Sequence, residues 1–269
     1  MVKFRNIKLF IGKCFSVIVK YCNLCMYFLH QEDGINIETL RSLKNKYLGQ
    51  RCFIVCTGPS LKKEDLDVLY NNEEITFSCN KIDKIFEQTK WRPTFYCVTD
   101  EHYQHTLLDT MNIVPSIMQF YSKESFLTTR KCKNPHVWLN THRRLQPGKM
   151  FSYDLTDHIN DYGTVTYDLI QLAVYLGFKY IYIIGCDHSY ARQINKDGSV
   201  SINNSPSYFS GSDSENQEVL TDVGVMDIAY EQAKLEMEKG AFKIFNATRG
   251  GKLEYFPRVE FDSLFNSNI

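Results

Sequence analysis

The chain has 269 residues, which is enough to bury a full hydrophobic core in one large domain or in one domain with additions. Its 31 basic and 31 acidic residues balance, so the overall charge gives no reason to expect a nucleic-acid partner. The nine cysteines are odd in number, and the C-x-x-C from Cys22 to Cys25 has no second pair of ligands. These features disfavour a zinc site and favour a reducing compartment.

The first thirty residues are basic and apolar and contain no acidic residue. The uncharged run from Tyr21 to Leu29 is too short to span a bilayer, and no small-residue cleavage site follows it. One interpretation is a helix at the membrane surface, with its lysines towards anionic headgroups. The other is a helix packed on the domain, or a disordered tail. We assign residues 1–46 to an N-terminal helix and linker, and 47–269 to a catalytic domain.

Apolar runs then alternate with segments of helical periodicity. Strands are predicted at 52–56, 75–79, 94–98, 180–184 and 242–245, with weaker candidates at 116–121 and 136–139. Helices are predicted at 62–70, 163–177 and 224–239, and Ser60 and Thr164 are candidate N-caps of the first two. The alternation predicts an α/β fold, Rossmann-like, with a mainly parallel sheet and helices on both faces. A long polar segment, about 191–222, is a candidate lid.

Polar or glycine-containing tips follow the predicted strands. The tips are Thr57-Gly58, Asn80, Thr99-Asp100, Asp187-His188-Ser189-Tyr190 and Asn246. Singly, each tip is better explained as turn chemistry. Because parallel strands end at one edge of their sheet, the tips together predict a ligand site there.

His188 is the best-placed general acid or base, since it follows a strand-end aspartate and histidine titrates near neutrality. A histidine that only holds its loop by hydrogen bonds explains the position equally well. His102 and His105 have a possible metal spacing without a third ligand, and no metal site is assigned. The sequence contains no P-loop, G-x-S-x-G or H-E-x-x-H motif, which disfavours a P-loop kinase or a serine hydrolase.

Several of these segments together resemble known families. They are Thr57-Gly58-Pro59-Ser60-Leu61, Cys79-Asn80, Asp100, Gly163-Thr164, the run from Leu176 to Asp187, and the run from Phe245 to Leu253. The set resembles domain of unknown function 115, which the MptE-like pterin pyrophosphokinases share with the motility-associated glycosyltransferases. It is more distantly similar to the family-42 bacterial sialyltransferases. The resemblance covers roughly residues 47–265.

The resemblance implies a domain that binds a nucleotide-activated sugar, with a CMP-linked nonulosonate as the expected donor and no metal. The residues it places at the donor are Thr57, Gly58, Pro59, Ser60, Asn80, Asp100, Thr164, Asp187 and Ser189. Ser189 or Tyr190 takes the place of a tyrosine that steadies the leaving phosphate. The catalytic histidine of the sialyltransferases has no counterpart in the matching stretch, Tyr208 to Asp213, so either His188 or Asp213 does its work or the reaction differs.

The leading hypothesis is therefore a metal-independent glycosyltransferase of bacterial surface-glycan assembly, with no cofactor besides its donor. The expected acceptor is a glycan or a lipid-linked glycan, and the expected location is the cytoplasm, with peripheral membrane contact through residues 1–30. The alternatives are an MptE-like pyrophosphokinase, which needs Mg²⁺, and a non-catalytic nucleotide- or glycan-binding protein.

Overall fold

The computed structural model describes residues 2–30, 32–100, 106, 108–143, 150–202, 206–209 and 220–266, with side chains from residue 16 onward. Its helices are α1 (Val2–Leu29), α2 (Asp33–Leu43), α3 (Lys63–Asn71), α5 (Leu108–Ile113), α6 (Phe126–Thr129), α7 (Val165–Tyr175) and α8 (Val223–Glu238). Three 3-10 turns accompany them, η1 (Ile82–Ile85), η2 (Lys123–Ser125) and η3 (Phe261–Leu264).

The strands are β1 (Arg51–Val55), β2 (Thr76–Cys79), β3 (Phe95–Val98), β4 (Met118–Ser122), β5 (His136–Leu139), β6 (Thr141–His142), β7 (Ile159–Asn160), β8 (Tyr180–Ile184), β9 (Arg192–Ile194), β10 (Val200–Ile202), β11 (Thr221–Asp222) and β12 (Lys243–Asn246).

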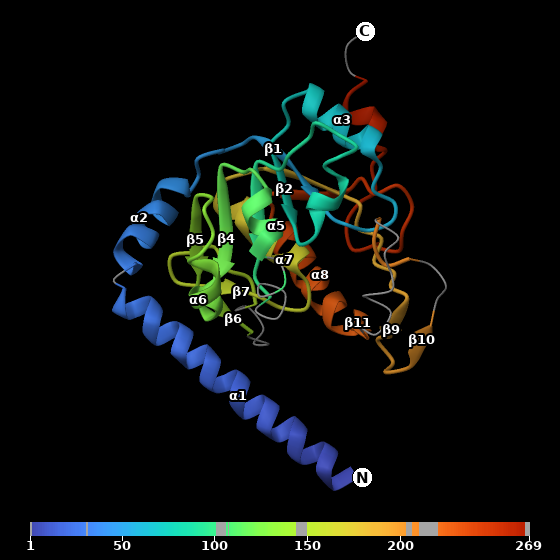
Figure 1. Cartoon of the computed structure of the whole chain (residues 1–269). Coiled ribbons are helices and arrows are strands. Elements are labelled where there is room, and N and C mark those ends of the chain that lie inside the picture. Colours follow the sequence, from blue (N-terminus) through green and yellow to red (C-terminus); the bar gives the residue numbers. More distant parts are fainter. Residues whose placement is uncertain are drawn as a thin grey trace.

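A parallel sheet organises the described part of the chain (Figure 1). Its seven strands follow the order β12-β8-β1-β2-β3-β4-β5, and every neighbouring pair is parallel. The chain passes from β1 outward to β5 and then returns to lay β8 against the other side of β1. The strand order therefore reverses beside β1, which is where open α/β sheets bind their ligands. The predicted Rossmann-like fold is confirmed.

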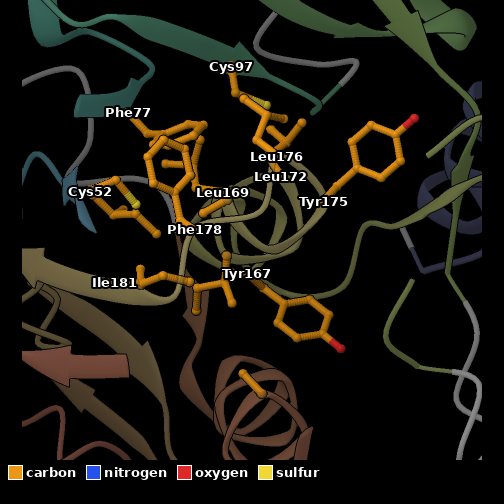
Figure 2. Packing of buried hydrophobic residues seen from close by; sticks show 14 of the residues in the cluster. Cys52, Phe77, Cys97, Tyr167, Leu169, Leu172, Tyr175, Leu176, Phe178 and Ile181 are labelled. Atoms are coloured by element: carbon orange, nitrogen blue, oxygen red, sulfur yellow. The ribbon is translucent and has the colours of Figure 1, made fainter. Parts of the chain in front are cut away.

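Helix α7 covers one face of the sheet. Its apolar residues recur at helical spacing, and buried Leu169 and Leu172 belong to one cluster with Cys52 of β1 and Ile181 of β8 (Figure 2). Thr164 is its N-cap, because its side chain accepts a hydrogen bond from the N–H of Thr166. Helix α8 packs alongside α7 and belongs to the same buried cluster. Burying a leucine contributes on the order of 2 kcal/mol, so this layer is a main source of stability.

The opposite face is covered by α3, by η1 and by the end of α1. Leu66 and Leu69 of α3 and Ile82 of η1 are buried against Phe53 and Val55 of β1. The strands therefore have apolar residues on both sides, as expected for a sheet covered by helices on both faces. Predicted helix 62–70 is observed as α3, but Ser60 is not its cap. The helix begins at Lys63, and its N-cap, Lys62, makes no side-chain cap hydrogen bond.

Two helices precede the sheet. The C-terminal part of α1 is anchored by Tyr27, which is fully buried, and by Asn23, whose Oδ1 accepts the N–H of Leu127 at 2.8 Å. The N-terminal half of α1 projects away from the sheet as a single rod (Figure 1). The polar stretch that follows contains α2, which the sequence did not indicate. In α2, buried Asn36 pairs through its amide with the backbone N–H and C=O of Trp138.

The candidate lid contributes a small sheet beside α8. Strand β9 lies between antiparallel β10 and parallel β11. Residues 203–205 and 210–219 of the candidate lid lie outside the described residues. In the described part of the chain, no helix combines the length and apolar character needed to cross a bilayer.

Candidate functional site

A cavity of about 460 Å³ opens at the carboxyl edge of the sheet. Its wall is formed by strand tips, by the first turns of α7 and α8, and by the segment after β8. Predicted residues that line it are Thr57, Gly58, Asn80, Asp100, Thr164, Asp187, His188, Ser189 and Tyr190. Residues that the sequence did not single out include Cys56, Arg143, Asp161, Thr166, Cys186, Ser207 and Asp222. A cavity of this volume accommodates a small-molecule ligand.

The turn after β1 lies tightly against the tip of β8. The N–H of Gly58 donates to the carbonyl oxygen of Gly185 at 2.8 Å. A Cβ at Gly58 would lie 2.2 Å from Oδ2 of Asp187 and 2.6 Å from the Gly185 oxygen. No side chain fits that space. Glycine is required here by close packing of the two strand tips, whatever ligand the cavity holds.

Ser60 and Pro59 do not line the cavity, although the family resemblance implies that they lie at the donor. Ser60 instead binds Asp187, whose Oδ2 accepts its hydroxyl at 2.8 Å and its N–H at 3.1 Å. Asp187 does line the cavity, but that oxygen is occupied in holding the β1 turn to β8. The pair therefore positions the cavity wall.

His188 is buried, has an unusual backbone conformation, contacts an acidic side chain and keeps one ring nitrogen without a described partner. It is only 8% exposed, and its backbone has a φ of 51°, a left-handed conformation that histidine rarely adopts. Its Nε2 lies 2.8 Å from Oδ1 of Asp227 in α8. Its Nδ1 is buried and has no hydrogen-bond partner among the described residues. With a proton on Nε2 donated to Asp227, Nδ1 carries a lone pair that no described residue uses.

Two helix N-termini converge on the cavity. Thr164, Val165 and Thr166 at the start of α7 line it, as do Asp222 and Val225 at the start of α8. Asp222 caps α8 by accepting the N–H of Val225 at 3.1 Å. Helix N-termini present backbone N–H groups and the positive end of the helix dipole, so they favour an anionic ligand.

The helices approach each other closely at Gly163. The backbone φ there is +75°, and a Cβ would lie 2.9 Å from the carbonyl oxygen of Val225. Gly163 therefore permits both the left-handed turn before α7 and the approach of α8.

The carboxyl groups of Asp100 and Asp161 also line the cavity. Burial raises the pKa of Asp161, while Arg143, 3.3 Å away, acts in the opposite direction and Asp100 adds to the rise. Behind them, burial raises the pKa of Asp168 well above its usual range, although Thr99 donates to this carboxyl at 2.5 Å. A raised pKa favours the neutral form of a carboxyl group, which reduces the negative charge that an anionic ligand would meet here.

Asn80 and Tyr190 also shape the wall. Asn80 has a φ of 49°, and its carbonyl oxygen accepts the Tyr96 hydroxyl at 2.6 Å. Burial raises the pKa of Tyr190, so its hydroxyl keeps its proton at neutral pH and remains a possible donor. Asn246, by contrast, does not line the cavity. It is buried, and its amide donates to the carbonyl oxygen of Leu253 at 2.6 Å.

Some predicted positions fall outside the described residues. They are Asp213 and the histidine pair His102 and His105. In the described part of the chain, no group of three or more His, Cys, Asp or Glu side chains is arranged to hold a metal ion. Asp227 was missed because nothing in the α8 sequence distinguishes it from a solvent-facing aspartate. Gly163 and Thr164 were visible in the sequence as a glycine and a cap before a strong helix.

The family model for 6-hydroxymethylpterin diphosphokinase MptE-like proteins matches residues 28–193, well over half of the chain. The chain belongs to this MptE-like family. The match spans α2, strands β1 to β8 and α7, and therefore the β1 turn, Asn80 and the Asp187–His188 tip. Among curated proteins, none matches the sequence.

Among solved structures, the fold is similar to the MAf glycosyltransferase from Magnetospirillum magneticum AMB-1. The TM-score is 0.52 at 16% identity, over 87% of this chain and 39% of that one. At this identity the likeness establishes a shared fold. The chain spans well under half the length of that enzyme, and α8 with Asp227 lies beyond the MptE-like match.

Proposed function

We propose that this MptE-like protein is a glycosyltransferase that uses a nucleotide-activated sugar, with a CMP-linked nonulosonate as donor. The observation that carries the proposal is His188, held by Asp227 with its Nδ1 unpartnered among the described residues of the cavity wall. The helix N-termini of α7 and α8 supply the anion-binding character that a nucleotide phosphate requires. Its proposed setting is surface-glycan assembly in bacteria, on the cytoplasmic side.

In the proposed reaction, Nδ1 of His188 removes the proton from an acceptor hydroxyl. The acceptor oxygen forms a bond to the anomeric carbon of the sugar while the bond from that carbon to the phosphate oxygen breaks. The electron pair of the broken bond leaves with CMP. Asp227 stabilises the imidazolium that forms, in the way that a carboxylate supports the histidine of a catalytic triad.

Several other residues support this reaction by binding. The Tyr190 hydroxyl, which keeps its proton, donates to the departing phosphate, and Ser189 and Thr164 face the same cavity. The described part of the candidate lid contributes Ser207 and Asp222 to the cavity wall and helps to exclude water from the donor. Asp213 remains a second candidate base.

A diphosphokinase is the second candidate, and the description of the family model favours it. In that reaction a pterin-like alcohol attacks the β-phosphorus of ATP and gives up its proton. The bond from the β-phosphorus to the oxygen of the α-phosphate breaks, so the alcohol receives the diphosphate and AMP leaves. Mg²⁺ would neutralise the phosphate charge, with Asp100 and Asp187 as its ligands. Asp100 lines the cavity near Asp161, whereas Oδ2 of Asp187 is already bound by Ser60.

Ligand-dependent thermal stabilisation separates these activities. The protein is heated with CMP, CMP-sugars, GTP or ATP, each with and without Mg²⁺. Stabilisation by CMP without metal supports the transferase, since a ligand at 100 times its Kd adds about 2.7 kcal/mol to the folded state. Stabilisation by ATP only with Mg²⁺ refutes it and identifies the diphosphokinase. Stabilisation by CMP without turnover of any CMP-sugar identifies a binding protein.

The role of His188 is tested by His188→Asn, because asparagine tolerates the left-handed backbone at this position better than alanine. Loss of a general base predicts a fall in kcat of about 10²- to 10⁴-fold. Asp227→Asn should reduce kcat less and shift the pH–rate profile. Exposed His30 provides the control, since His30→Ala leaves the cavity unchanged. Equal donor turnover in His188→Asn and the control would make His188 structural.

A further inference from the structure

Helix α1 leaves a broad apolar face uncovered. Large apolar side chains on its described part are strongly exposed, namely Val17, Ile18, Tyr21, Phe28 and Leu29. The opposite side of the same stretch is anchored by buried Asn23 and Tyr27. Val17 and Ile18 lie four and three positions before Tyr21, and exposed Cys25 lies between Tyr21 and the pair Phe28 and Leu29, so the exposed residues form one continuous stripe along the helix. Five large apolar side chains in one exposed stripe mark an interaction surface.

The sequence continues this stripe towards the N-terminus. Phe4, Ile7, Ile11 and Cys14 precede Ile18 at alternating spacings of three, four, three and four. Positions on either side of this row of residues are also apolar, including Phe10, Phe15 and Val17, so the stripe is broad. A two-stranded coiled coil has a narrower seam with charged flanking positions that form salt bridges between the helices. The width of the stripe therefore favours burial in lipid over pairing with a second copy.

The positive charge of residues 1–30 also favours lipid as the partner of α1. The five cations of residues 1–30 are Lys3, Arg5, Lys8, Lys13 and Lys20, and no acidic residue accompanies them. Two copies of such a helix repel each other, whereas an anionic leaflet attracts each lysine or arginine near its surface by about 1 kcal/mol. Only Lys20 among these side chains lies in the described part, where it pairs with Glu124 of the domain.

The docking position of α1 connects this surface to the cavity. Helix α1 packs against η2 and α6, which follow β4 directly and so lie at the carboxyl edge of the sheet. Figure 1 shows α1 running past the ends of the β4 and β5 arrows. The cavity opens at this same edge. A membrane that receives α1 therefore lies on the side of the molecule where the cavity is formed.

We propose that α1 is a surface anchor for anionic lipid and that it holds the cavity towards an acceptor carried by a membrane lipid. The second half of this statement rests on the proposed transferase function, and the first half does not. The apolar stripe enters the boundary between headgroups and acyl chains, while the cations remain at the phosphate level. The helix lies in the plane of the leaflet.

Vesicle co-sedimentation of the full chain tests the anchor without donor or acceptor. Vesicles of phosphatidylcholine alone are compared with vesicles that also contain phosphatidylglycerol. We expect binding to the anionic vesicles at low salt, with the partition coefficient falling at least about tenfold at high salt because exposed charges are screened. Equal binding to both vesicle types, or no binding, overturns the proposal.

A pair of double variants locates the surface. Ile18→Glu with Tyr21→Glu introduces two charges on the stripe, where these residues are 59% and 63% exposed. Ile113→Glu with Ile117→Glu introduces the same charges at 61% and 57% exposure, just before β4 at the amino edge of the sheet. The first variant should lose at least about tenfold in partitioning, and the second should bind as the wild type does. Circular dichroism checks that both remain folded.

Two further measurements distinguish the remaining explanations. Light scattering after size exclusion measures the mass of the wild type, and a dimer that the α1 variant abolishes overturns the lipid surface in favour of a second copy. If the variant transfers sugar to a soluble acceptor normally but is slow on a vesicle-bound acceptor, the orientation is supported. If vesicle binding holds while no sugar transfer is found, the transferase fails and the anchor stands.

Discussion

The packing at Gly58 gives the sharpest stability prediction. In Gly58→Ala the new methyl group would lie 2.2 Å from Oδ2 of Asp187 and 2.6 Å from the carbonyl oxygen of Gly185. Neither neighbour can move freely, because Asp187 is bound by Ser60 and Gly185 accepts the Gly58 N–H. The strand tips must therefore separate.

The expected cost has two parts. Overpacking of a well-filled site costs about 1–3 kcal/mol, and loss of a hydrogen bond to a carboxylate costs about 2 kcal/mol. A total of about 3–5 kcal/mol corresponds to a fall in Tm of about 10 °C for a chain of this length. Urea unfolding followed by circular dichroism measures the free energy directly, and a thermal melt measures the shift.

Gly34→Ala is the matched control. Gly34 lies in the first turn of α2, and nothing lies within 4 Å of the Cβ that alanine would add. This variant should keep or raise the free energy of unfolding by up to about 1 kcal/mol, because alanine favours the helix. The reasoning is refuted if Gly58→Ala unfolds within about 1 kcal/mol of the wild type.

Two more variants probe the charged groups. Arg249→Met should lower the free energy of unfolding by about 3–5 kcal/mol, because Asp65, which is buried and bound through both oxygens, is left unpaired. Asp262→Asn removes the exposed partner of Arg249 and should cost less than about 1 kcal/mol in the same urea titration; equal losses would contradict this assignment. Burial raises the pKa of Asp168, so the folded chain keeps this proton after the unfolded chain has lost it, and the contribution of Asp168 to stability falls as pH rises above about 4. The stability of Asp168→Asn relative to wild type should therefore increase with pH in unfolding titrations from acid to neutral, and a constant difference would show that Asp168 does not contribute.

Much of the fold follows from the sequence because a sheet covered on both faces needs strands that are apolar throughout. β1 and β8 show this, and their continuous apolar runs predicted both strands. Helix α7 was predicted for a related reason, since its apolar spacing and the Thr164 cap are local signals. Such features need no knowledge of distant residues.

The missed elements depend on distant contacts. Helix α2 has few apolar residues, and it is fixed by Asn36, which binds the backbone of Trp138 from a hundred residues away. Ser60 had the right residue type for a helix cap, but Asp187 competes for its hydroxyl. Neither partner can be identified from local spacing.

The cavity was predicted more completely on the sheet side than on the helix side. The tips Asn80, Asp100 and His188 meet at one edge because parallel strands end together, and topology alone places them. Asp227 reaches His188 from α8, and this pairing depends on how that helix is rotated about its axis. The rotation of α8 about its axis is set by its packing against α7, and the sequence of α8 alone does not specify this packing.

The position of β1 in the interior of the sheet, between β8 and β2, has a consequence for how the protein is made. One edge of β1 pairs with β2, which follows it closely in the chain, whereas the other edge pairs with β8, in which Tyr180 lies opposite Arg51. Until β8 has been synthesised, the N–H and C=O groups of that edge are unpaired, and such an edge can pair with another chain. Long-range parallel pairing is slow, so we expect a nascent chain to remain open along β1 until about two thirds of it has been synthesised. A chain truncated before β8 should therefore aggregate, and the β1 turn would never meet the Asp187–His188 tip.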